Sequence, residues 1–160
     1  GSRCAFAVAT LSCILMCTAL YLAAATAPPL VPWVEAKPGL HVYAPDGGHE
    51  STRTQFTLPY VVQLGAYSGC ACGFGYSSTP ALSKQHRDEE EASHACLAAL
   101  ADYLDALIAV AGPVQLRMSY YAGDNRPAER VLHRTTGWFR DRAAFDMEEG
   151  DLVHVGKCVG

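Results

Sequence analysis

The chain opens with an uninterrupted apolar segment. Of the 24 residues from Cys4 to Ala27, 20 are apolar and none is charged. A helix needs about 20 such residues to cross the hydrocarbon core of a bilayer. The pattern therefore predicts an N-terminal hydrophobic helix over residues 4–27.

Three interpretations of this segment remain open. With Arg3 in front of it, the segment fits a signal anchor. The small residues at Ala23–Ala25 or Ala25–Ala27 fit the cleavage site of a secretory signal. The third interpretation is a non-native segment or a buried helix. We expect a membrane-anchored or exported protein, with membrane contact only through residues 4–27, if the segment is native, and a cytoplasmic protein otherwise.

Proline then separates this segment from the rest of the chain. Residues 28–38 contain four prolines, which favours an extended linker. Residues 39–157 change to a mixed polar and apolar composition without an internal repeat. They are predicted to form a single α+β domain.

The first part of this domain alternates between polar and apolar positions, as β-strands do. Leu40–Ala44 is a short strand candidate, and Asp46, Gly47 and Gly48 after it favour a turn. Residues 54–64 then carry large side chains at every second position, which predicts a long half-buried strand. Pro59 interrupts its other face, so it favours an edge position or a break.

The strongest element is a helix over residues 88–111. Its acidic start, Asp88 to Glu91, suits the positive end of a helix dipole, and Gly112-Pro113 ends it. Apolar residues recur at steps of three and four and predict one buried stripe. That stripe consists of Cys96, Leu100, Tyr103, Leu104, Leu107 and Ala111.

Three further strands follow the helix. Residues 114–121 alternate cleanly and predict a half-buried strand, residues 130–135 are predicted to pair back with it, and residues 152–155 form the last strand. The sum is an α+β, two-layer fold. A four- to five-stranded, mostly antiparallel sheet carries one long helix on a face, preceded by the N-terminal hydrophobic helix.

The net charge of the chain limits the kinds of partner that it can bind. The chain has a net charge of -4 and a pI near 5.8, so no basic field exists to hold a phosphate backbone. We therefore expect no nucleic-acid partner.

The segment from Gly65 to Tyr76, which we call the glycine-cysteine loop, has a composition that the predicted helices and strands do not account for. Its glycines leave bare backbone that another chain could approach, so Gly69, Gly73, Phe74 and Gly75 are candidates for an interaction surface. Neither a dinucleotide fingerprint nor a phosphate-binding loop is present.

Cys70 and Cys72 are the candidate metal ligands, because thiolates bind zinc tightly. The paired knuckles that make a zinc site convincing are absent, and no other cofactor is indicated. Buried unreacted thiols and a disulfide or redox role, with Cys96 as a partner for one of the two, remain alternatives.

Arginine and aromatic residues mark a second candidate surface. Residues 126–142 contain five arginines and two acids, with Trp138 and Phe139 among them. Arginine and aromatic side chains dominate interface energetics. Arg130, Arg134, Trp138 and Arg140 are therefore the candidate contacts for a protein partner, although a solvated strand face beside a core aromatic fits the same pattern.

The sequence Gly69-Cys70-x-Cys72-Gly73-Phe74, followed by a long alanine-rich helix, resembles small uncharacterised bacterial α+β proteins with a G-C-x-C-G-F segment. The resemblance covers about Leu40 to Val155. It implies a shared fold and no activity, and an N-terminal membrane segment is not part of that pattern.

Taken together, these features predict a non-enzymatic α+β domain that acts as a protein-interaction module. The first alternative is a thiol or metal-binding protein that uses Cys70 and Cys72. The second is a small hydrolase, which would need a histidine beside Ser, Cys or Asp in a polar cavity.

Overall fold

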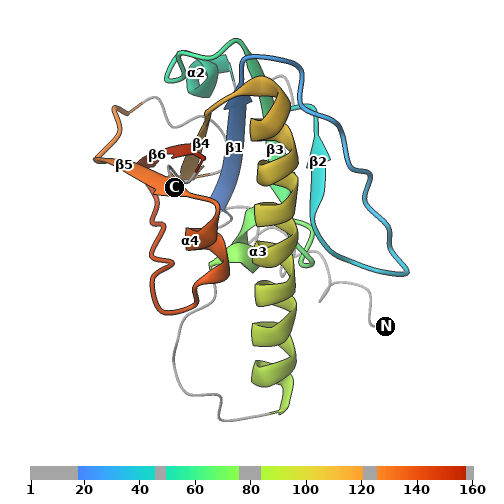
Figure 1. The fold of residues 1–160 in the computed structure, drawn as a ribbon. Coiled ribbons are helices and arrows are strands. Elements are labelled where there is room, and N and C mark those ends of the chain that lie inside the picture. Colours follow the sequence, from blue (N-terminus) through green and yellow to red (C-terminus); the bar gives the residue numbers. More distant parts are fainter. Residues whose placement is uncertain (1–17, 46–49, 76–83, 121–125, 158–160) are drawn as a thin grey trace, which may run out of the picture.

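The computed structural model describes residues 18–45, 50–75, 84–120 and 126–157, which form a sheet with one long helix on a face (Figure 1). In chain order the elements are β1 (Thr18–Ala24), β2 (His41–Tyr43), α2 (Glu50–Arg53), β3 (Tyr60–Gly65), the 3-10 helix η1 (Ala71–Phe74), α3 (Lys84–Ala111), β4 (Val114–Tyr120), β5 (Arg130–Thr135), α4 (Gly137–Arg140) and β6 (Asp151–Gly156). The strands form one six-stranded sheet in the order β2-β3-β1-β4-β6-β5. This confirms the α+β, mostly antiparallel fold with one long helix, and the sheet has more strands than the four or five predicted.

Strand β1 overturns the prediction of a hydrophobic helix over residues 4–27. It lies in the middle of the sheet and pairs antiparallel with β3 on one side and β4 on the other. Residues 19–24 are buried on both faces, which explains an apolar run without alternation. Residues 4–17 lie outside the described residues. Cleavage at either predicted signal site would remove β1 from the sheet.

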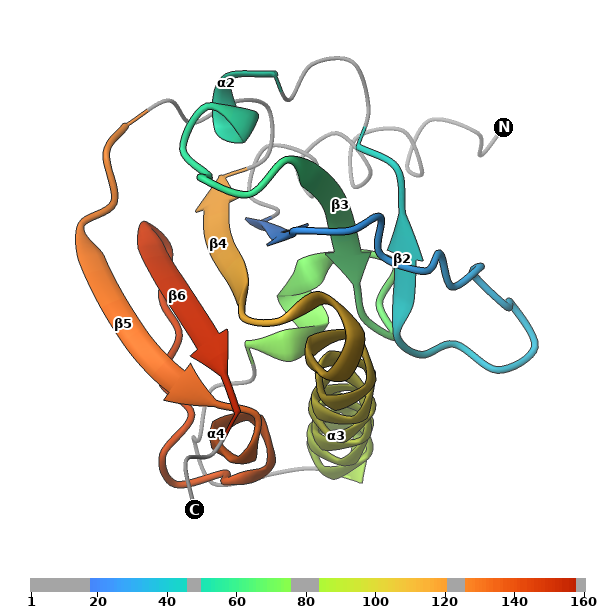
Figure 2. The same ribbon diagram turned by 45° about the horizontal axis from the view of Figure 1, so that its top comes forward.

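Helix α3 covers one face of the sheet, as Figure 2 shows with the helix seen nearly end on. It starts four residues earlier than predicted and ends before Gly112, whose φ of 76° favours glycine. Among the described residues, the part of α3 from Arg87 to Ala111 is long and apolar enough to cross a membrane. Its predicted stripe packs on the sheet, with Leu100 and Leu104 fully buried, so α3 is a core helix.

Strand β4 has the predicted alternation but is buried on both faces. It lies between β1 and β6, and the polar side chains of Gln115, Arg117 and Ser119 are at most 3% exposed. Gln115 is held by Thr57, whose amide donates to Oε1 at 3.0 Å and whose hydroxyl accepts from Nε2 at 2.9 Å. The predicted half-buried strand is therefore a central one.

The long strand predicted over residues 54–64 is shorter in the structure. Strand β3 begins at Tyr60, directly after Pro59, because proline cannot donate to a ladder. It pairs antiparallel with β2. The predicted turn at residues 46–48 lies outside the described residues. Phe56 packs instead against the face of β1 opposite α3.

Strands β5 and β6 pair in parallel, which the sequence did not predict. Strand β6 lies between β4 and β5, so β5 forms the edge of the sheet rather than pairing back with β4. The connection from β5 to β6 contains α4, whose Trp138 and Phe139 are buried in the core on the α3 side. Strand β5 therefore lies at the parallel edge of the sheet, with no described strand on its outer side.

The proline-rich residues 28–38 lie against the domain. Val31 and Val42 exchange two backbone hydrogen bonds, at 3.0 and 2.8 Å, which adds a single bridge beside β2. The Tyr103 hydroxyl of α3 donates to the Pro29 carbonyl at 2.8 Å, and burial raises the pKa of this hydroxyl to about 12. The segment is therefore attached to the domain at two points, through β2 and through α3.

Candidate functional site

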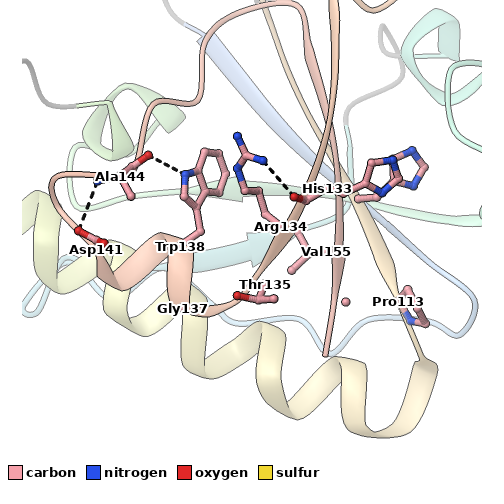
Figure 3. Close-up of a pocket in the computed structure, with 11 residues that line it drawn as sticks. Pro113, His133, Arg134, Thr135, Gly137, Trp138, Asp141, Ala144 and Val155 are labelled. Carbon is pink, nitrogen blue, oxygen red and sulfur yellow. Dashed lines mark hydrogen bonds between the residues drawn. The ribbon is translucent and has the colours of Figure 1, made fainter. Parts of the chain in front are cut away.

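A cleft of about 740 Å³ lies where β5 and β6 end and α4 begins (Figure 3). It brings together aromatic, cationic and imidazole side chains from the exposed end of the sheet. Its lining consists of Pro113, His133, Arg134, Thr135, Gly137, Trp138, Asp141, Ala144, His154, Val155 and Gly156.

The alternation of β5 divides this lining between two faces of the sheet. Arg134 points to the face that carries Trp138, whereas His133 points to the opposite face, and Figure 3 shows them on either side of the strand. The cleft therefore wraps around the edge of the sheet. A ligand that follows β5 would meet both groups.

The parallel register places His133 directly opposite His154. Their rings stack with centroids 4.9 Å apart and planes inclined by 16°. Burial, and then the charge of His133, lower the pKa of His154. The pair is therefore biased toward neutral imidazole on at least one ring.

Arg134 lies over the indole of Trp138, with its guanidinium carbon 5.2 Å from the ring centroid. Its Nη1 donates to the His133 carbonyl at 3.0 Å, and no carboxylate among the described residues pairs with it. The Trp138 indole N–H donates to the Ala144 carbonyl at 2.7 Å, which fixes the ring. The result is a positioned cation that no described carboxylate neutralises.

The other two predicted arginines are engaged within the fold. Arg130 donates from Nε and Nη2 to the buried carboxylate of Asp151 at 2.7 and 2.6 Å, and these hydrogen bonds raise the pKa of Arg130. Arg140 joins α4 to α3 through Asp102 at 2.5 Å and Asp105 at 3.0 Å. Of the predicted arginines, Arg134 is the one that lines the cleft.

The glycine-cysteine loop forms a tight turn that leads into η1. Gly69 has a φ of 82°, and Phe74 is buried in the core. A Cβ atom on Gly73 would lie 2.8 Å from the Cβ of Ala66, whereas one on Gly75 would meet no heavy atom within 4 Å. Gly73 is therefore required by close packing between two parts of the loop.

No disulfide joins any of the three described cysteines to another described residue. Cys72 is exposed, Cys70 is half-buried and Cys96 is buried. The Cys96 sulfur accepts the Tyr67 amide at 3.3 Å, which ties α3 to the loop without a disulfide. Within the described residues, no third His, Cys, Asp or Glu joins Cys70 and Cys72 to form a zinc-binding group.

The described lining residues of the cavities do not form the arrangement that a hydrolase needs. The cavity beside the glycine-cysteine loop has no histidine among its described lining residues. In the β5–β6 cleft, Oδ1 of Asp141 accepts the amides of Ala143 and Ala144 at 3.0 and 3.3 Å, so that oxygen closes a turn. Among the described lining residues, no histidine lies beside the Cys72 thiol in the first cavity, and the Asp141 Oδ1 atom is engaged in a turn in the second.

Sequence reasoning did not assign His133, His154, Thr135 or Asp141 to a common site. The two histidines become neighbours only through the parallel register of β5 and β6. Asp141 is separated from them by α4. A regular spacing of these residues, which would have marked a site, is absent from the sequence.

No protein-family model matches the chain, and comparisons with curated proteins and with solved structures find no match. The resemblance to proteins with a G-C-x-C-G-F segment therefore stays a prediction.

Proposed function

We propose that this chain is a protein-interaction module that binds an extended, acidic segment of a partner along β5. The observation that carries the proposal is the open edge of the sheet beside the Arg134–Trp138 pair. The bound segment would add a strand to the sheet and place an acidic side chain in the cleft.

The backbone of β5 is suited to this role. Its six residues pair with β6 on one side, so alternate N–H and C=O groups face away from the sheet. No described strand covers that side. Natural edges are commonly protected by proline or by a bulge. Strand β5 has no proline, and Val131 on it is 55% exposed.

The charges beside β5 favour an acidic partner. Arg134 offers a guanidinium that has no described carboxylate, and the indole beneath it limits its freedom before binding. A guanidinium fork matches a carboxylate in two parallel hydrogen bonds. His133 and His154, on the other face, add cationic character when they are protonated.

The proposal can be tested with a fluorescein-labelled peptide of alternating valine and glutamate, long enough to span β5. A matched peptide carries lysine in place of glutamate. We expect the acidic peptide to bind at least about tenfold tighter, because lysine beside Arg134 replaces attraction with repulsion. Fluorescence anisotropy measures both affinities. Hydrogen exchange should show slower exchange of β5 amides in the complex.

The variant Arg134→Ala should remove most of the preference for the acidic peptide. The control is Arg53→Ala, which changes an exposed arginine of α2 outside the cleft and should leave both affinities unchanged. Equal binding of the two peptides, or equal effects of the two variants, would overturn the proposal. So would a stable dimer through β5, seen by sedimentation, that the acidic peptide fails to dissociate.

A further inference from the structure

The two faces of β5 offer different charged groups to a neighbouring strand. Arg134 lies on the face that carries Trp138 and α3, and His133 lies on the opposite face (Figure 3). Successive side chains of any strand point to opposite faces of its sheet. A segment that pairs with the outer side of β5 would therefore place one side chain beside Arg134 and the adjacent one beside His133.

His133 is exposed and lies beside a second histidine. Its ring stacks on that of His154 with centroids 4.9 Å apart, and both residues line the β5–β6 cleft. On the same face, β4 presents the uncharged side chain of Gln115 opposite His154, and the α3–β4 connection contributes a proline to the cleft. The charged residues of the cleft lining, Arg134 and Asp141, lie on the other side of β5. The charge on this face is thus set by the two imidazoles.

The stacked pair accepts one proton more readily than two, because like charges on neighbouring rings repel. Burial, and then the charge of His133, lower the pKa of His154. Of the two rings, the exposed one of His133 is therefore the one that carries the first proton. Histidine gains its charge between about pH 8 and pH 5, a range in which glutamate stays largely ionised.

We propose that the partner segment carries two consecutive acidic residues, one paired with Arg134 and the next with His133, which takes up a proton as the segment binds. This inference rests on the proposed function of β5 as a docking edge. One proton moves from solvent to the His133 imidazole, and no other covalent bond changes. Side chains directly opposite on two paired strands lie close enough for opposite charges to attract. Because binding and protonation favour each other, the affinity rises as the pH falls.

Three peptides test the proposal. The first is the alternating peptide of valine and glutamate. In the second, one central valine becomes glutamate, and in the third the same valine becomes glutamine, which matches glutamate in size and has no charge. At pH 5.5 we expect the second peptide to bind about two- to fivefold tighter than the third, the effect of an opposite-charge pair across two strands. At pH 8, fluorescence anisotropy should give equal affinities for the second and third peptides.

Substitutions of single histidines identify the group that takes up the proton. His133→Gln should remove the difference between the two peptides at pH 5.5. His154→Gln should keep it, because His133 can still be protonated. The matched control is His94→Gln, which changes a histidine of α3 outside the cleft and should also keep the difference.

The outcomes separate this inference from the proposed function. If the alternating peptide binds no better than its lysine counterpart, the proposed function fails and the acidic pair fails with it. If that preference holds, three results would each overturn the acidic pair alone. These are equal binding of the glutamate and glutamine peptides at pH 5.5, a difference of the same size at pH 8, and a difference that survives His133→Gln.

Discussion

Replacement of Leu22 by alanine tests whether β1 is the centre of the sheet. Leu22 is fully buried and lies between Val62 of β3 and Leu116 of β4. A membrane segment, or a segment that does not belong to the folded domain, would contribute nothing to unfolding in water. The same substitution therefore gives opposite results under the two interpretations of residues 18–24.

The expected magnitude follows from complete burial. Leucine-to-alanine changes at fully buried sites cost about 3 to 5 kcal/mol, through the lost transfer free energy and the cavity left behind. The sheet on both sides of Leu22 resists collapse, so we expect at least 3 kcal/mol, within that approximate range. For a chain of this length, that loss lowers the melting temperature by roughly 6 to 12 °C.

Urea unfolding followed by circular dichroism measures this loss. The matched control is Leu30→Ala, which removes the same atoms from a side chain that is 60% exposed and should cost less than about 1 kcal/mol. Equal unfolding midpoints for Leu22→Ala and the unmodified chain would refute the central position of β1. Equal losses in Leu22→Ala and Leu30→Ala would refute it as well.

Two further outcomes are expected. Gly73→Ala should lower the free energy of unfolding by about 1 to 3 kcal/mol in a urea titration, because the new methyl group would press on Ala66. The control Gly75→Ala should change the free energy of unfolding by less than about 0.5 kcal/mol. Equal effects of the two substitutions would contradict the close packing of the loop. Burial and the charge of His133 lower the pKa of His154 in the folded chain, so the unfolded chain binds the proton more readily. The contribution of His154 to stability is therefore fully present above the ordinary histidine pKa of 6.5, and it falls as the pH drops below that value. His154→Gln should therefore lose less stability than the unmodified chain between about pH 7 and pH 5, and parallel stability curves for the two chains would contradict this origin.

The elements that the sequence predicted well are those in which one face is polar. The stripe of α3 and the alternation in β4 distinguish a helix from a strand by their period. Their ends were also marked, since Gly112 and Pro113 stop α3. Local chemistry was sufficient for these elements.

Strand β1 could not be predicted in this way. A strand buried on both faces has no polar period, so Thr18–Ala24 presents the same pattern as part of a membrane helix. The neighbouring apolar residues at 4–17 lengthened the run and favoured the helix. Only the partners on both sides, β3 and β4, identify it as a strand, and they lie far away along the chain.

The candidate site was predicted only in part, for a related reason. Arg134 and Trp138 are four residues apart, so a local excess of arginine and aromatic residues was visible. His133 and His154 come together through the order of the strands, because β6 inserts between β4 and β5. The sequence predicted that residues 130–135 pair back with residues 114–121, and nothing local specified the insertion of β6 between them.

The central place of β1 also affects how the chain acquires its fold during synthesis. Strand β1 leaves the ribosome before either of its neighbours, and about 90 residues separate its end from the start of β4. At typical elongation rates of 5 to 20 residues per second, that interval lasts roughly 5 to 20 s. For that time the most apolar strand has one partner at most and two edges that can join another nascent chain. Its folding is thus dominated by contacts distant in sequence, and the yield of soluble protein should depend on chaperone capacity and temperature more than on the stability of the finished fold.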